Sequence, residues 1–205
     1  MAAQITFPKP LSLFRLIFGL YLFGLGIAIL ITAALGLAPW DVFGQGIANL
    51  TGLSFGLATV LASALILILW IPLKQMPGLG TVFNALLIGP FVDLSLKFLP
   101  ATDTWPLMAR IGWYLLGMAI IATGTGIYIG AKLGPGPRDG LMTGSVKRFK
   151  QPVWIVRSVL EGGAMLIGIA LGGPVGIGTI MFVVGIGPMV QVSMRAFGLV
   201  DRSGK

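Results

Sequence analysis

Cysteine and histidine are both absent from this chain of 205 residues. Their absence rules out disulfide bonds and thiolate nucleophiles, and it removes the commonest zinc ligand and the usual base of serine hydrolases. The motif Gly52-x-Ser54-x-Gly56 resembles the nucleophile elbow of those hydrolases, but without histidine it predicts no catalytic serine. The chain also has no Gly-rich phosphate loop with its lysine and no zinc-protease motif. We therefore expect no enzyme, no cofactor and no metal site.

Charge is scarce as well, since only 10% of the residues are charged and 56% are hydrophobic. Soluble domains average roughly a quarter charged residues. Uncharged runs recur at Leu16–Leu35, Leu53–Leu73, Ile111–Ala131 and Ile177–Met194, each close to the ~20 residues that cross a bilayer. The first run is too long for the apolar core of a signal peptide. Residues 1–205 therefore form a single membrane domain whose main partner is the lipid bilayer.

Acidic residues are outnumbered, with 6 Asp and Glu against 14 Lys and Arg, which gives a net charge of +8. Nucleic-acid-binding modules gather such charge with aromatic residues on a soluble face. Here the basic residues stand at the ends of the apolar runs. The excess of positive charge therefore indicates membrane topology, and we expect no nucleic-acid partner.

An internal repeat becomes visible when the sequence is shifted by 98 positions. Residues 35–93 and 133–191 then match at 14 of 59 positions, and half of these matches are Gly or Pro. Shared Gly and Pro indicate a shared backbone path more than shared hydrophobicity. We expect an all-α fold of two copies, at 11–100 and 107–199, each with three spans and a short broken or re-entrant helix. The predicted spans are 12–34, 54–73, 81–99, 107–132, 153–172 and 178–197.

Three spans is an odd number, so the second copy must cross the bilayer in the opposite direction to the first. Lys and Arg collect on the cytoplasmic side of membrane proteins. With a cytoplasmic N-terminus, Lys97 and Arg110 are the two basic residues on the outside, and the other twelve, including Arg202 and Lys205, are inside. We therefore expect an inverted repeat with both termini in the cytoplasm.

A helix breaker and a short amphipathic segment follow the first span of each copy. Pro39 and Pro137 end the preceding helix, and Asp41 and Asp139 are expected to be the N-caps of the short helices 41–49 and 139–150. Broken helices within a membrane are tolerated where protein or a water-filled cavity satisfies their backbone, and they mark the substrate site in many transporters. The alternative is that both segments lie flat at the membrane interface.

Ionisable residues within the predicted spans are further candidates, because charge in hydrocarbon is costly and usually faces the bundle interior. Arg157 and Glu161 stand four residues apart on one helical face. They either line a pathway or form a structural ion pair, and Asp93 either lines it or caps a helix near the outer interface. With their repeat counterparts, the candidate pathway residues are Trp40, Asp41, Asp93, Arg138, Asp139, Arg157, Glu161 and Gln191.

Two glycine motifs permit close helix approach, Gly126-x-x-x-Gly130 and Gly168-x-x-x-Gly172. They serve either internal packing or the face of a homodimer. Internal packing is the favoured interpretation.

The repeated motif also resembles a known group of proteins. The segments Gly36-Leu-Ala-Pro-Trp-Asp-Val42 and Gly130–Met142, the latter being the more specific, are similar to the YczE/YitT group of bacterial membrane proteins. The similarity extends over nearly the whole chain, including Val156–Glu161 and Ile186-Gly-Pro188. It implies a bacterial plasma-membrane protein and brings no binding residues with it.

Three functions remain compatible with the sequence. The first is transport of a small molecule or ion, as a transporter, exporter or channel, with Arg138 and Arg157 receiving an anionic group. The second is an accessory membrane protein that binds a partner without moving anything. The third, which the missing catalytic motifs make the least favoured, is an enzyme acting on a lipid-linked substrate whose phosphate would bind at Arg138 and Asp139.

Overall fold

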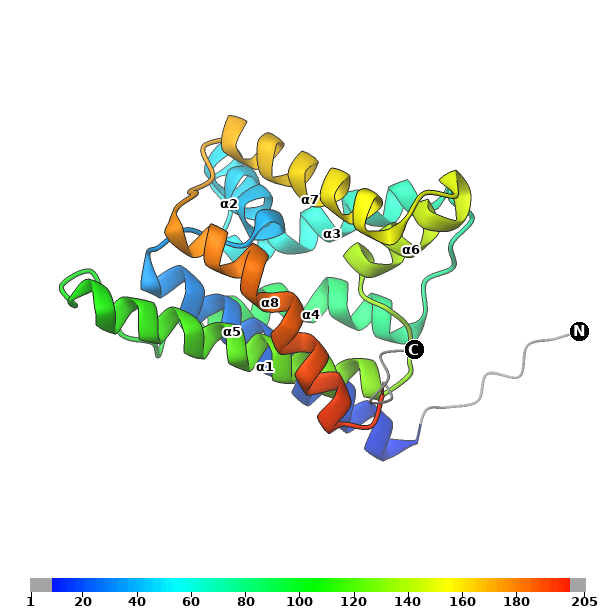
Figure 1. Ribbon diagram of the computed structural model, residues 1–205, viewed down its shortest axis with the longest axis horizontal. Helices are drawn as coiled ribbons and strands as arrows, with labels where there is room; N and C mark the ends of the chain where they lie inside the picture. The colour runs from blue at the N-terminus through cyan, green and yellow to red at the C-terminus, as the bar shows by residue number, and fades with distance from the viewer. Residues whose placement is uncertain (1–8, 200–205) are drawn as a thin grey trace, which may run out of the picture.

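The computed structural model describes residues 9–199, which form eight α-helices and contain no strand (Figure 1). In chain order the helices are α1 (Pro10–Ala33), α2 (Pro39–Thr51), α3 (Phe55–Trp70), α4 (Leu79–Leu96), α5 (Leu107–Gly130), α6 (Pro137–Phe149), α7 (Val153–Ala170) and α8 (Ile177–Ala196).

The all-helical prediction is confirmed element by element. Six helices coincide with the predicted spans, α2 and α6 coincide with the short segments, and each boundary lies within three residues of its prediction. One of the largest differences is the end of α3 at Trp70 instead of residue 73. Pro72 lies two residues further on and has no backbone N–H with which to continue the helical hydrogen bonds.

Several of these helices are long and apolar enough to cross a membrane. Within residues 9–199, α1, α4, α5, α7 and α8 meet this description individually. The bent pair α2 and α3, whose axes meet at 112°, brings the number to six if it is counted as one broken span. The chain is therefore a multi-pass membrane protein.

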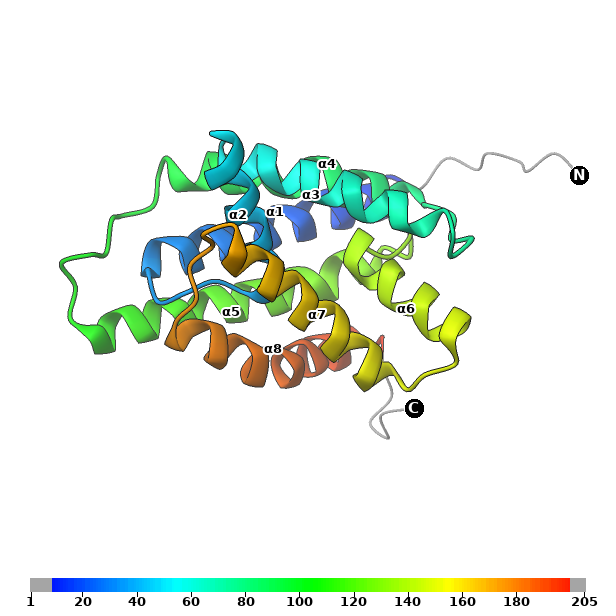
Figure 2. The ribbon, with the colours of Figure 1, turned by 90° about the horizontal axis from the view of Figure 1, so that it is seen from above.

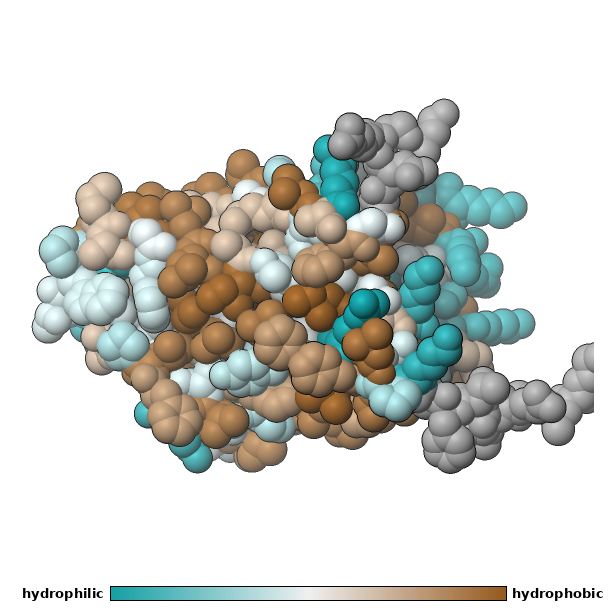
Figure 3. Space-filling model, turned by 90° about the horizontal axis from the view of Figure 1, so that it is seen from below, coloured by the Kyte–Doolittle hydropathy of each residue, from teal (hydrophilic) through white to brown (hydrophobic). Residues whose placement is uncertain are grey.

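The outer surface agrees with lipid as the surrounding medium. Figure 3 shows a broad hydrophobic band across the middle of the molecule, with strongly hydrophilic side chains gathered at one end. Large apolar side chains point outward on most helices, for example Leu57, Ile68, Leu86, Leu166 and Val184, which are between 52% and 72% exposed. Exposed apolar surface on this scale is stable in contact with hydrocarbon.

The two long helices α1 and α5 pack against each other at the centre of the molecule, and glycines allow their close approach. A methyl group added to Gly19 would lie 2.8 Å from the carbonyl oxygen of Gly124, and one added to Gly26 would lie 2.7 Å from that of Gly117. Side chains of Leu20, Ile27 and other fully buried residues fill the space around this contact. The α1–α5 pair is thus the closely packed centre of the fold.

The backbone of the two halves turns at corresponding residues. Within residues 9–199, eight of the nine residues with φ between 51° and 119° fall into pairs that are 98 positions apart. Left-handed backbone is unfavourable for residues other than glycine, so its recurrence reflects a shared chain path. The pairs are Ala34 with Lys132, Gly36 with Gly134, Gly52 with Lys150, and Lys74 with Gly172.

Hydrogen bonds between the halves are reciprocal. The N–H of Gly178 donates to the carbonyl of Leu35, and the N–H of Gly80 donates to the carbonyl of Leu133, both at 2.7 Å. Gly178 and Gly80 are 98 positions apart, as are Leu133 and Leu35. Each half therefore holds the start of the other half's last helix.

The two glycine motifs are used for internal packing. A methyl group added to Gly168 would lie 2.5 Å from the backbone nitrogen of Phe43 on α2, so α7 approaches α2 closely there. Gly126 on α5 faces Ser193 on α8 in the same manner. One glycine of each motif, Gly168 or Gly126, therefore packs closely within the chain.

The basic segments gather at one end of the molecule, where the start of α1, the α3–α4 and α6–α7 connections and the end of α8 lie (Figures 1 and 2). At the opposite end, Arg110 donates hydrogen bonds to the carbonyls of Ala33 and Ala34, which close the C-terminus of α1. Arg202 and Lys205 lie outside the described residues. The described basic residues in the segments at the first end are Lys9, Lys74, Lys132, Lys147, Arg148, Lys150 and Arg195.

Candidate functional site

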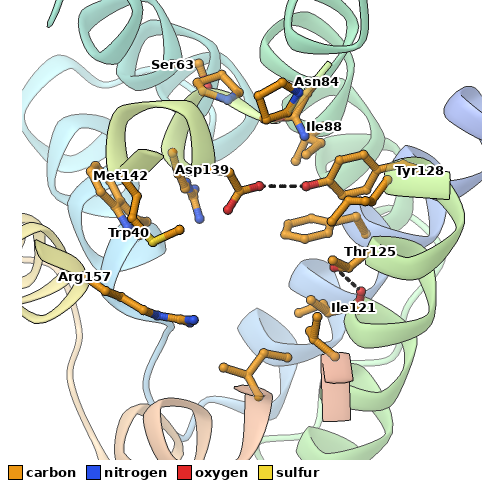
Figure 4. Close-up of a pocket in the computed structure, with 18 of the residues that line it drawn as sticks. Trp40, Ser63, Asn84, Ile88, Ile121, Thr125, Tyr128, Asp139, Met142 and Arg157 are labelled. Atoms are coloured by element: carbon orange, nitrogen blue, oxygen red, sulfur yellow. Dashed lines mark hydrogen bonds between the residues drawn. The ribbon is translucent and has the colours of Figure 1, made fainter. Parts of the chain in front are cut away.

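A cavity of about 640 Å³ lies among the helices, and all eight of them contribute to its wall. This volume is typical of small-molecule sites. Most of the wall is apolar, but several ionisable side chains interrupt it (Figure 4). They are Lys132, Arg138, Asp139, Arg157 and Glu161.

The starts of α2 and α6 bring the repeated motif to this cavity. The prediction that Asp41 and Asp139 are N-caps is wrong, because Ala38 and Gly136 occupy the cap positions and the helices begin at Pro39 and Pro137. Proline suits the first helical position because its nitrogen carries no hydrogen that would need a partner. Both aspartates therefore lie in the first turn, where negative charge is favourable.

Arg138 connects the two copies of the motif. Its guanidinium donates to Asp41 over 2.9 Å and lies 5.7 Å from the centre of the Trp40 ring. The Asp41 side chain is only 3% exposed, whereas Arg138 and Trp40 reach the cavity wall. Asp41 thus anchors Arg138 from behind the wall and joins α2 to α6.

Asp139 lies on the cavity wall itself and is exposed to the cavity. Its carboxylate accepts a hydrogen bond of 2.9 Å from the hydroxyl of Tyr128 on α5, as Figure 4 shows. Asp139 is the repeat counterpart of Asp41. The two aspartates have therefore diverged, one held by an arginine and one bonded to a neutral phenol.

Arg157 and Glu161 form an ion pair along one turn of α7, with the Arg157 Nε donating to the Glu161 Oε1 over 2.8 Å. Both line the cavity, and their side chains are 49% and 26% exposed. Figure 4 shows the Arg157 side chain pointing into the open space. The pair is thus accessible from the cavity and is not sealed within packed side chains.

The repeat counterparts of this pair, Thr59 and Ser63 on α3, also line the cavity. Corresponding positions of the two halves therefore share one wall, charged on α7 and neutral on α3. Within residues 9–199 the buried hydroxyl of Thr59 has no hydrogen-bond partner.

Asp93 lies outside the cavity wall, on α4 beside the start of α3. Its carboxylate accepts hydrogen bonds from the Ser54 hydroxyl at 2.5 Å and from the Gly56 N–H at 2.8 Å, so it caps the start of α3. Its counterpart Gln191 is exposed on α8. Of the two sequence-based interpretations of Asp93, the structure fits the helix-capping contact.

The helix pairs on either side of the cavity differ between the halves. α3 packs along α4, where the backbones of Gly56 and Gly89 touch. In the described part of the chain, α7 and α8 do not pack along each other, and a methyl group added to Gly187, the counterpart of Gly89, would meet no atom within 4 Å. Figure 1 shows α7 and α8 diverging toward the basic end of the molecule.

Two polar residues of the cavity wall were not predicted from the sequence. Tyr128 and Asn84 line the cavity from α5 and α4, and each is an isolated polar residue in an apolar span. Asn84 is the single amide in its predicted span, which was the available signal. A tyrosine near a span end is usually an interfacial anchor, so Tyr128 gave no such signal.

Comparison with known proteins places these features in a family. Residues 11–195 match a family of unknown function (DUF6198). The chain belongs to this family. An "Uncharacterized protein" of Haemophilus influenzae is 40% identical over 86% of this chain and 80% of its own length.

Two further relatives come from Bacillus subtilis. The "Uncharacterized membrane protein YczE" is 33% identical over 86% of this chain and 82% of its own length. The "Uncharacterized protein YyaS" is 29% identical over 86% of this chain and 89% of its own length. The similarity to the YczE group is thereby confirmed. No solved structure matches the chain at a significant level.

The name of one of these relatives states a membrane protein, and none of the three names states a substrate. The cavity is the feature of the chain that bears most directly on function. Its wall includes Trp40, Arg138, Asp139, Arg157 and Glu161 among the predicted pathway residues.

Proposed function

We propose that the chain is a transporter of small solutes and that the central cavity is its solute site. The observation that carries this proposal is an accessible cavity, within membrane-spanning helices, whose wall contains two arginines and two carboxylates. Charged groups at such depth are costly and usually serve a substrate or ion pathway. A solute site without a reaction also fits a chain that lacks cysteine, histidine and the common catalytic motifs.

The proposal treats the two halves as an inverted repeat. Two observations support it. The left-handed residues recur at equivalent positions of both halves, and the hydrogen bonds of Gly178 and Gly80 join the halves through equivalent residues in both directions. Transporters built in this way hold their substrate at the interface of the repeats, beside helices that are interrupted there. α2 and α6 would be those interrupted helices.

The difference between the helix pairs supports alternating access. The α3–α4 pair is closed through Asp93, Ser54 and Gly56, whereas α7 and α8 stand apart. If the halves exchange these two arrangements, the cavity opens first on one side and then on the other. The described conformation would be the one that is open between α7 and α8.

The basic end of the molecule indicates which side this is. Lysine and arginine near span ends favour the cytoplasmic face, and the segments around α7 and α8 at that end carry Lys147, Lys150 and Arg195. We therefore orient the chain in a bacterial plasma membrane with both termini in the cytoplasm. The cavity would then face the cytoplasm, and the α3–α4 pair would close the outer side.

Single-cysteine labelling tests the proposal, because the chain has no cysteine of its own. Met142, a half-buried residue of the cavity wall, is replaced by cysteine and exposed to a membrane-impermeant maleimide in right-side-out and inside-out vesicles. Alternating access predicts fast labelling from the cytoplasmic side and slower labelling from the outer side. Reaction from one side under all conditions would contradict transport, and a steady ionic conductance would identify a channel.

A further inference from the structure

We infer that the solute is an amphipathic zwitterion, such as an amino acid with an apolar side group; this inference rests on the proposed function. The cavity wall is divided in a way that suits such a molecule. Its charged residues come from α6, α7 and, with Lys132, the α5–α6 connection, whereas α1, α5 and α8 supply a largely apolar side. Apolar members of that side are Phe23, Ile121, Phe182, Ile186 and Val190.

Asp139 is the group that would receive an amino group. Within residues 9–199, Asp41 forms an ion pair with Arg138, and Glu161 forms one with Arg157. No ion pair in this part of the chain includes Asp139. The hydrogen bond from the Tyr128 hydroxyl occupies one acceptor site of its carboxylate but brings no positive charge into direct contact with it. A carboxylate in a membrane-embedded cavity gains most from a ligand that brings a positive charge and N–H donors.

Arg157 is the group that would receive an acidic group. Its bond to Glu161 uses the Nε hydrogen, so the two terminal amino groups of the guanidinium remain to face the cavity. These terminal donors can bind both oxygens of a carboxylate at once. Arg138 is less available, because one of its terminal nitrogens already bonds to Asp41.

The apolar side of the wall indicates a third property of the ligand, which is an apolar side group. A small polar zwitterion such as glycine would leave that side in contact with trapped water. A ligand with an aromatic or branched side group would displace the water and bury apolar surface, and each further methylene strengthens binding by about fourfold. We therefore expect selectivity for amino acids with large apolar side groups.

A matched ligand series tests each charge separately. The purified full chain in nanodiscs is titrated with L-phenylalanine, with phenethylamine, which lacks the carboxylate, and with 3-phenylpropionate, which lacks the amino group. We expect L-phenylalanine to bind at least tenfold more tightly than either analogue, and L-alanine to bind weakly. A single-charge analogue that binds as tightly as L-phenylalanine would overturn the inference.

Variants assign the two charges to residues. Asp139→Asn should abolish the preference for L-phenylalanine over 3-phenylpropionate, and Arg157→Gln should abolish its preference over phenethylamine. Arg195→Gln, which removes a charge outside the cavity wall, should change neither preference. Thermal unfolding of each variant verifies folding, and retained preferences in a folded Asp139→Asn or Arg157→Gln would count against the assignment.

Failure of this inference is separable from failure of the proposed function. If none of the probes binds but the cysteine at position 142 still reacts from both sides, the transporter proposal stands and the zwitterion class is wrong. If that cysteine reacts from one side under all conditions, both are wrong.

Discussion

The ion pair between Arg138 and Asp41 has unequal surroundings, which gives a directional prediction. Asp41 is almost fully buried, while Arg138 is 28% exposed at the cavity. Arg138→Gln should therefore destabilise the fold more than Asp41→Asn, because it leaves a charge buried without a partner. We expect a loss of about 3 kcal/mol for Arg138→Gln.

Thermal unfolding of both variants in the same detergent measures this difference. Glu161→Gln serves as the control, since it removes a carboxylate from a pair whose side chains are both partly exposed. Equal losses for Arg138→Gln and Asp41→Asn would show that the burial of Asp41 does not decide the stability of the pair.

Among single residues, the sequence identified most of the charged side chains of the cavity wall, because charge in an apolar span is conspicuous. Arg157 and Glu161 were recognisable in this way. It could not separate Asp41 and Asp93 from the wall residues, because their partners Arg138 and Ser54 are 97 and 39 positions away. Tyr128 was missed because nothing in a sequence shows which side of α5 faces a cavity.

Among the helices, the α1–α5 contact depends on glycine. Gly26→Ala should destabilise the fold by about 1–3 kcal/mol, because its methyl group would lie 2.7 Å from the Gly117 carbonyl oxygen and 2.5 Å from Ile121. Gly162→Ala on α7 is the matched control, as its methyl group would meet nothing within 4 Å in the described structure. Equal thermal stability of the two variants would contradict the tight α1–α5 contact.

The contact between Asp93 on α4 and the start of α3 should control access to the cavity from the outer side. Asp93→Ala removes the two hydrogen bonds that join α4 to the start of α3, and loss of a capping contact costs about 1 kcal/mol. Labelling of the cysteine at position 142 from the outer side should therefore become about fivefold faster.

Asp103→Ala is the control for this experiment, because it removes an exposed charge from the loop between α4 and α5. It should leave the labelling rate unchanged. An unchanged rate in Asp93→Ala as well would mean that this contact is structural and does not gate the cavity.

The whole molecule has one basic end and one end with few charges, which predicts its orientation in the membrane. Lys74→Cys should react with an impermeant maleimide from the cytoplasmic side, and Asp103→Cys should react from the outer side. These positions lie in connections at opposite ends of the fold. The reverse pattern in oriented vesicles would overturn the orientation, and labelling of both cysteines from one side would overturn the topology.

The sequence by itself determined the helices. The length of each apolar run, the prolines and glycines that end it, and the recurrence of Gly and Pro at 98 positions are local properties, and they fix where the chain is helical and where it turns. Local signals were sufficient here because backbone hydrogen bonds within each helix are nearly obligatory in lipid.

The tertiary structure alone decided which polar groups face one another and which helix pairs stand apart. The partnership of Arg138 with Asp41, the exposure of Asp139 to the cavity and the separation of α7 from α8 depend on how the helices are rotated and packed. Packing in a bilayer is governed by close shape complementarity and a few polar contacts between distant residues, and no local stretch of sequence records them.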